Sequence, residues 1–189
     1  MKNFQLIAPN MDVLPLLLAI KRQPELWRED TYLRDYPQGP FKQIETIMLR
    51  FPPRTVHESE AARDLYFTLN DQHECIDYPP YKILSDARPL IMWLMSRVSG
   101  ERLGRCMINK VAPGGRIFPH ADTPEHAEYY SRFHIVLQSN PESEFRAGDE
   151  TVNMAAGEIW WFDNKQVHEV HNHGTTDRIH LVVDIRTAR

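Results

Sequence analysis

The sequence has little cysteine and no excess of basic residues. Its two cysteines, Cys75 and Cys106, lie far apart and in no metal-binding spacing, which favours a reducing compartment with two free thiols. The formal net charge is −4. Because nucleic-acid-binding proteins usually carry a basic excess or a basic stripe, a nucleic-acid partner is not expected.

Long apolar runs, internal repeats and low-complexity segments are missing as well. The apolar run near the N-terminus, residues 13–20, contains Pro15 and is not followed by a small-residue cleavage site. This run is too short to cross a bilayer and does not resemble a secretory signal. We therefore expect no membrane contact and a cytoplasmic location.

What the sequence does have is an ordinary globular composition. Its 189 residues are 42% apolar and 25% charged, which suits a single domain over residues 1–189. Residues 1–103 form a mixed helical and extended flanking region, with helices expected over residues 58–69 and 86–98. Their apolar faces, such as that of Ala62, Leu65 and Leu69, are expected to pack on the outside of a sheet.

The texture changes near residue 104, where short extended runs separated by turns begin. Strands are expected at 106–111, 116–120, 133–137, 159–162, 166–170 and 178–185, with a hairpin over 145–152. Many short strands at regular spacing are typical of a jelly roll or barrel. The sequence therefore predicts a mainly β fold with flanking helices (α+β), whose core strands lie in residues 104–189.

One arrangement of histidines in this half is suited to a metal. His120 and Asp122 are two residues apart on an extended segment, so their side chains point the same way, and His168 follows at a distance. Two histidines and one carboxylate form the facial triad of non-haem iron(II) oxygenases. Taken alone, such a pair is weak, because Asp122 or Thr123 could instead cap a short helix with Pro124 at its first position.

The last strand carries an arginine that needs a partner. Arg178 and His180 share one face of residues 178–184, while the other face is aliphatic. An unpaired buried charge is costly, so Arg178 is expected either to bind an anionic carboxylate or to form a salt bridge with Asp177 or Asp184. Arg132 and His134 likewise share one face of their strand, which indicates either a lined cavity or the solvent face of a sheet.

Four stretches of this half together resemble a known family. PGGRIFPHAD, RFHIVL, GEIWWFDNKQVHEV and NHGTTDRIHLVVDI, within residues 107–186, are similar to the aspartyl/asparaginyl β-hydroxylases, which are 2-oxoglutarate oxygenases. The resemblance implies a double-stranded β-helix (jelly roll, cupin-like) that binds Fe(II) and uses 2-oxoglutarate as co-substrate. It also implies hydroxylation of an aspartyl or asparaginyl residue, an amino acid or a related small molecule.

The resemblance assigns roles to particular residues. His120, Asp122 and His168 would be the iron ligands, and Arg178 would pair with the far carboxylate of 2-oxoglutarate. Arg132, His134 and, least directly, Asn109 would contact the co-substrate or substrate. The partners implied are a small-molecule or peptide or protein substrate, and a homo-oligomer is left open.

Other polar residues are candidates for substrate contact. The segment between Asp122 and Arg132 is long and charged, and it is expected to overhang the site, where it would select substrate or act as a lid. The candidates within it are His126, Glu128, Tyr129 and Tyr130. Arg54, His57 and Arg116 could meet an anionic substrate, and the spacing does not exclude His171 as a ligand in place of His168.

Three alternatives fit parts of the same pattern. A cupin-type metal enzyme that does not use 2-oxoglutarate would share the fold and ligands but would not need Arg178. A non-catalytic module that binds a small acid would keep the shape without turnover. A zinc hydrolase would also use two histidines and a carboxylate, but no general base lies at the expected spacing.

Overall fold

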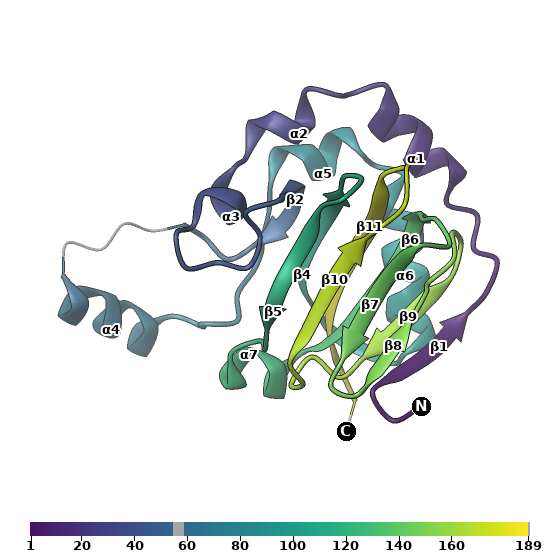
Figure 1. Cartoon of the computed structure of the whole chain (residues 1–189). Helices are drawn as coiled ribbons and strands as arrows, with labels where there is room; N and C mark the ends of the chain where they lie inside the picture. Colours follow the sequence, from purple (N-terminus) through teal and green to yellow (C-terminus); the bar gives the residue numbers. More distant parts are fainter. Residues whose placement is uncertain (55–58, 189) are drawn as a thin grey trace.

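Two antiparallel sheets form the body of the protein (Figure 1). The computed structural model describes residues 1–54 and 59–188. The larger sheet has the strand order β1 (Phe4–Ala8), β9 (Ile159–Phe162), β6 (Ser131–Gln138), β11 (Arg178–Thr187), β4 (Gly100–Val111), β2 (Ile44–Phe51) and β3 (Ile76–Asp77). The smaller sheet has the order β5 (Arg116–His120), β10 (His168–Asn172), β7 (Ser143–Ala147) and β8 (Glu150–Val152). The predicted mainly β fold with flanking helices is confirmed.

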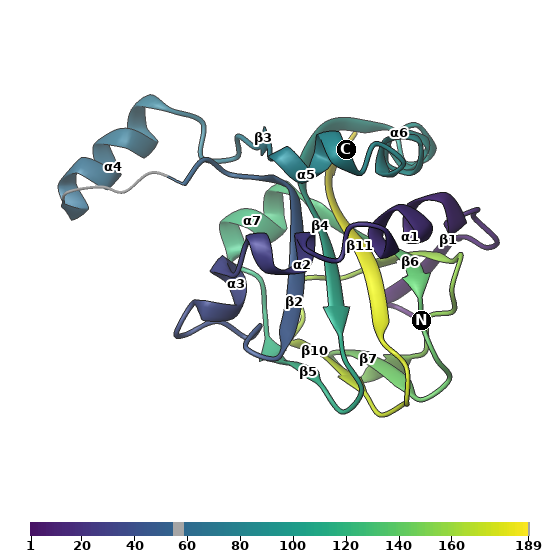
Figure 2. The same cartoon turned by 90° about the horizontal axis from the view of Figure 1, so that it is seen from above.

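Helices cover the outer face of the larger sheet (Figure 2). The described helices are α1 (Leu14–Lys21), α2 (Leu26–Glu29), α3 (Tyr32–Asp35), α4 (Glu60–Leu69), α5 (Pro79–Ile83), α6 (Ala87–Arg97) and α7 (Pro124–Tyr129). The helices α1, α2, α5 and α6 supply side chains to the core on this face. Side chains of α1 and α6, such as Leu16, Ile91 and Leu94, pack in one core with Ile108 of β4 and Leu181 of β11. Burying this apolar face is what fixes the helices on the sheet.

α4 does not follow that pattern. Leu65 is 59% exposed and Leu69 is 74% exposed, and the helix extends away from the sheets (Figures 1 and 2). The expectation that this helix packs on the sheet is therefore wrong, although its start is defined by Ser59, whose hydroxyl accepts a hydrogen bond from the Ala62 N–H. None of the described helices is long and apolar enough to cross a membrane.

A second core lies between the two sheets. Phe4, Phe145 and Phe162 pack together there, with ring centroids 4.7 to 6.3 Å apart. Because side chains alternate along a strand, the inward face of β11 carries Arg178, His180, Val182 and Asp184, while its outward face joins the helix-covered core. The space between the sheets is thus apolar in part and strongly polar along the inward face of the larger sheet.

The first half of the chain contributes to this body. β1 pairs with β9 and β2 pairs with β4, so both strands belong to the larger sheet. Asn3 also joins the two sheets, because its backbone N–H donates to Glu150 and its amide donates to the Ala147 carbonyl. The flanking region expected over residues 1–103 therefore supplies strands to the sheet as well as helices. The single domain over residues 1–189 stays a prediction.

Candidate metal centre

His120, Asp122 and His168 lie together at one end of the smaller sheet. His120 ends β5 and His168 begins β10, and the two residues stand directly opposite each other in the strand pairing. Their ring centroids are 4.2 Å apart. One ligand atom from each of the three residues lies within 4.8 Å of the other two. Neighbouring strands thus bring together residues that are distant in sequence.

The two imidazoles are oriented alike. Nδ1 of His120 donates to the Phe118 carbonyl at 2.8 Å, and Nδ1 of His168 donates to the Gln166 carbonyl at 2.9 Å. Burial, followed by the neighbouring His120, lowers the pKa of His168 to about 4, and burial lowers the pKa of His120. Both rings are therefore neutral at pH 7, with the Nε2 lone pairs free, which is the form that binds a metal.

Asp122 is held by two side chains. Arg132 approaches its carboxylate at 2.7 Å, and the Asn164 amide donates to it at 2.9 Å. Burial opposes the charged form, but Arg132 and the Asn164 hydrogen bond hold the pKa of Asp122 below its usual value. Of the two cap candidates, Thr123 is the N-cap residue of α7 with Pro124 directly after it, but it forms no side-chain cap bond. Asp122 is not the cap, so the cap does not account for Asp122.

Arg132 is shared between two carboxylates. Besides Asp122, it binds Asp184 through two hydrogen bonds of 2.7 and 3.0 Å, and His126 donates to the same Asp184 at 2.8 Å. Burial opposes both charges, yet Arg132 holds the pKa of Asp184 far below its usual value. Arg132 therefore positions Asp122, and its predicted contact with the co-substrate stays a prediction. His126 is buried in this network, and its role in substrate selection or in a lid stays a prediction.

Arg178 begins β11, at the end of its inward face opposite to Asp184, and has no carboxylate partner among the described residues. It is 2% exposed, and burial lowers the pKa of Arg178 to about 9. Among the described residues it makes no ion pair, so the expected salt bridge to Asp177 or Asp184 is not formed. Its Nη2 donates to Nδ1 of His180 at 3.1 Å.

Arg178 also sets the protonation of two buried histidines. Because arginine can only donate, Nδ1 of His180 must accept, and the proton of His180 lies on Nε2, which has no hydrogen-bond partner in the described structure. His134 then donates from its own Nδ1 to His180 at 3.2 Å. The Nε2 of His134 is left as an acceptor. Burial, followed by Arg178, holds the pKa of His180 well below its usual value.

A narrow cavity lies between the two histidines of the metal centre and His134. Its lining residues are Phe41, Met107, Asn109, Ile117, His120, Arg132, His134, Phe145, Phe162, His168, Val170 and Val182. The volume is about 30 Å³, which is the share of one water molecule in the liquid. Side chains must therefore move outward to admit a larger molecule. Asn109 lies in this wall and accepts a hydrogen bond from Thr46 at 3.0 Å.

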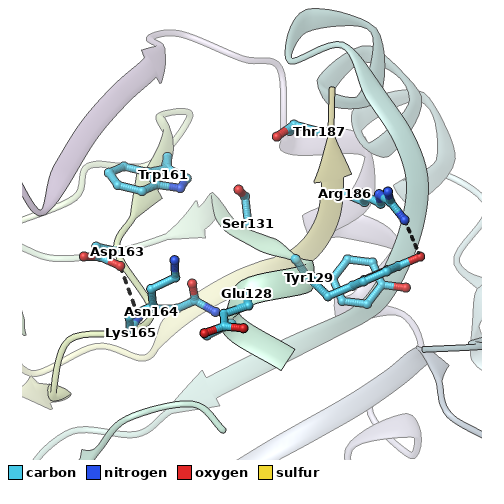
Figure 3. Close-up of a pocket in the computed structure, with 11 residues that line it drawn as sticks. Glu128, Tyr129, Ser131, Trp161, Asp163, Asn164, Lys165, Arg186 and Thr187 are labelled. Atoms are coloured by element: carbon cyan, nitrogen blue, oxygen red, sulfur yellow. Dashed lines mark hydrogen bonds between the residues drawn. The ribbon is translucent and has the colours of Figure 1, made fainter. Parts of the chain in front are cut away.

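Wider pockets lie outside this cavity. One of about 540 Å³ is lined by Glu128, Tyr129 and Tyr130 together with residues of β9 and β11 (Figure 3). It meets the triad only through Asn164, which also holds Asp122. The three candidate residues of the 123–131 segment therefore face this outer pocket and do not line the narrow cavity.

The remaining candidates lie elsewhere. His171 points away from the triad and packs against His173, with ring centroids 3.7 Å apart. Arg54 pairs with Asp30 and Arg116 pairs with Glu169. His57 lies outside the described residues. None of these arrangements brings a further side chain to the metal centre.

A comparison with family sequence profiles assigns the chain to a family. The profile described as "Aspartyl/Asparaginyl beta-hydroxylase" matches residues 83–188, which is more than half of the chain. The chain belongs to this family. The predicted resemblance is thus confirmed, and the match extends further towards the N-terminus than residues 107–186.

Two curated proteins are relatives of this family member. L-proline cis-4-hydroxylase of Rhizobium meliloti (strain 1021) is 34% identical over 77 residues, which cover 41% of this chain and 28% of that protein. L-proline cis-3-hydroxylase 1 of Streptomyces sp is 31% identical over 90 residues, which cover 46% and 31%. The match thus spans about a third of the length of these relatives.

Solved structures share the fold. AviO1 from Streptomyces viridochromogenes Tue57 is similar over 98% of this chain and 90% of its own, with a TM-score of 0.57 and 14% identity. The viral collagen prolyl hydroxylase of Paramecium bursaria Chlorella virus-1 is similar over 100% and 97%, with a TM-score of 0.51 and 11% identity. The predicted double-stranded β-helix is confirmed.

Sequence reasoning missed three residues of this site. Asp184 was considered only as a partner for Arg178, whereas it binds Arg132 and His126. Asn164 lies in a turn before His168, and no spacing links it to Asp122. Arg105 lies on the same inward face of β4 as Met107 and Asn109, and alternation along that strand could have indicated it.

Proposed function

We propose that this chain is an Fe(II)- and 2-oxoglutarate-dependent hydroxylase of an amino acid or amino-acid residue. The family membership and the donor set support iron: His120 and His168 offer Nε2 atoms, and Asp122 offers a carboxylate. Bound iron and 2-oxoglutarate would supply oxidation by molecular oxygen, with succinate, carbon dioxide and a hydroxylated C–H bond as products. The names of the two curated relatives support an amino-acid substrate.

The burial of Arg178 without a carboxylate partner among the described residues is the single observation that supports 2-oxoglutarate as the co-substrate. A buried guanidinium without a carboxylate is costly, and a carboxylate of 2-oxoglutarate would match its two-pronged donors. His180 fixes the position of this guanidinium, and the acceptor Nε2 of His134 leaves that ring able to bind a donor in the cavity. The rings of Phe145 and Phe162 surround His134 and exclude water from it.

The other side chains have supporting tasks. Arg132 and Asn164 orient Asp122, so that its carboxylate faces the two imidazoles in ionised form. The two backbone carbonyls that accept from Nδ1 of His120 and His168 hold the rings in one tautomer. Both cysteines are free, which supports the proposed cytoplasmic location.

The test is an anaerobic titration of the metal-free protein with Fe(II) and then with 2-oxoglutarate, followed by visible absorbance. We expect a weak charge-transfer band that needs both additions and is lost in His168→Ala. In Arg178→Gln the half-saturating 2-oxoglutarate concentration should rise on the order of 100-fold, whereas Arg146→Gln, on the exposed side of β7, should behave as the wild type. Iron binding without a band would contradict the proposal and favour a cupin-type enzyme or a binding module.

A further inference from the structure

Arg105 is a second cation on the inward face without a counter-ion. It lies on β4, two residues before Met107 and four before Asn109, and both of these residues line the cavity. Its Nε is buried and has no hydrogen-bond partner. Within the described part of the chain its guanidinium makes no ion pair, and its one aromatic contact is the Phe51 ring at 5.1 Å.

Other arginines near Arg105 do have carboxylate partners. Arg102 of the same strand pairs with Asp71, Arg50 of β2 pairs with Asp77, and Arg132 has two carboxylates. Burial lowers the pKa of Arg105, and Asp184 opposes that shift from a distance without contacting it. A guanidinium in this position gains most from an anion that arrives from outside.

One molecule of 2-oxoglutarate cannot serve both unpaired arginines. Arg178 stands opposite Val111 in the pairing of β11 with β4, and Val111 is six residues along β4 from Arg105. At about 3.3 Å per residue the two positions are about 20 Å apart along the strand. This separation is far longer than a five-carbon diacid, so Arg105 calls for a second acid.

The pocket in front of Arg105 has room for that acid. It holds about 610 Å³ and is lined by Arg105, Gln72, His73, Thr123, Glu125 and His126, with Asp64 and Phe67 of α4. Thr123 follows Asp122 directly in the chain, and His126 contacts the Asp184 that fixes Arg132. The pocket therefore lies next to the side chains that hold Asp122 in place.

The charges of this pocket suit a ligand that has both signs. Arg105 supplies a positive group in its wall, while Glu125 supplies a carboxylate to the same lining. A free α-amino acid carries a carboxylate and an ammonium group on one carbon, and it would satisfy both. A residue inside a peptide chain has neither group free.

We propose that Arg105 binds the α-carboxylate of the substrate and that the substrate is a free α-amino acid. This inference rests on the proposed hydroxylase function and makes it more specific. Arg105 would select substrates by that carboxylate, while Arg178 would select the co-substrate. The two roles are separable, because the two arginines lie at opposite ends of the inward face.

The experiment uses full-length protein loaded anaerobically with Fe(II) and 2-oxoglutarate. The standard free L-amino acids, including L-proline, and their carboxamides are titrated, with the shift of the charge-transfer band as the binding signal. Substrate-dependent consumption of 2-oxoglutarate is measured in parallel. We expect at least one free acid to bind and its carboxamide to bind on the order of 10- to 100-fold more weakly.

The variants separate recognition from folding. Arg105→Gln should lose this preference for the acid while forming the Fe(II)/2-oxoglutarate band as the wild type does, and Arg105→Lys should keep part of it. Arg146→Gln is the matched control and should keep all of it. Circular dichroism shows whether each variant is folded, and Arg105→Lys provides the test if Arg105→Gln is not.

Four results would overturn the inference. They are normal band formation with no free acid bound, equal binding of acid and carboxamide, unchanged discrimination in Arg105→Gln, and an N-acetylated aspartyl peptide binding better than any free acid. Failure of the proposed function looks different, because the wild type would then form no charge-transfer band before any amino acid is added.

Discussion

At the scale of single residues, breaking one of the buried ion pairs around Arg132 should destabilise the protein strongly. Arg132 and Asp184 are buried and bonded through two hydrogen bonds. In Asp184→Asn the guanidinium loses a charged partner, so we expect the metal-free protein to lose about 3–5 kcal/mol of unfolding free energy. Urea denaturation measures this loss.

A matched control uses the same substitution at an exposed pair. Asp71→Asn removes the partner of Arg102, and both side chains are partly solvent-exposed, so the expected loss is about 0–1 kcal/mol. Equal losses in the two variants would contradict the view that burial gives the Arg132 network its importance.

The buried histidines predict how stability depends on pH. Burial, followed by Arg178, holds the pKa of His134 and of His180 well below the value of about 6.5 in an unfolded chain. Below pH 6.5 the unfolded state therefore takes up protons that the folded state does not, and stability falls as the pH falls. In His180→Phe the slope of unfolding free energy between pH 6 and 5 should decrease by about 1.4 kcal/mol per pH unit. An unchanged slope in urea titrations of metal-free protein would show that His180 is protonated in the fold.

Strand alternation explains what could be predicted at this scale. It indicated that Arg178 with His180, and Arg132 with His134, share inward faces. It could not assign Asp184 to Arg132 rather than to Arg178, because the choice depends on which end of the neighbouring strand lies opposite. The register of β6 against β11 pairs Asp184 with Arg132, and register is a tertiary property.

At the scale of secondary-structure elements, β1 supports the site from behind without supplying a ligand to it. Phe4 is 2% exposed and packs on Phe145 and Phe162, which contact His134 and His168. Phe4→Ala should therefore cost about 3–5 kcal/mol of unfolding free energy. Leu6, on the other face of the same strand, is 42% exposed, and Leu6→Ala should change little. Denaturant unfolding of both variants tests whether the buried face of β1 is essential.

Elements of the second half could be predicted closely, and those of the first half could not. The strands β5 and β9 begin and end where the pattern placed them, because turns and alternating side chains bound them. β1 and β2 have no such local boundaries, and their pairing with β9 and β4 determines them. α4 has a helical pattern and a cap, but the pattern does not say whether a partner surface exists.

At the scale of the whole molecule, a bound metal should raise stability by mass action. Ligands from β5 and β10 meet only in the folded chain, so Fe(II) at 100 times its dissociation constant should add about 2.7 kcal/mol. The anaerobic melting temperature should rise with Fe(II) and fall back with a chelator. His168→Ala should abolish the shift, and a full shift in that variant would place the metal elsewhere.

The position of β5 gives this binding event a second meaning. β5 is the outermost strand of the smaller sheet and is hydrogen-bonded within it to β10 alone, and His120 at its end faces His168 across that single seam. An ion bound by both histidines would cross-link this edge strand to β10. Metal binding would then also hold the edge strand in place, so the metal-loaded protein would be the form that unfolds most slowly.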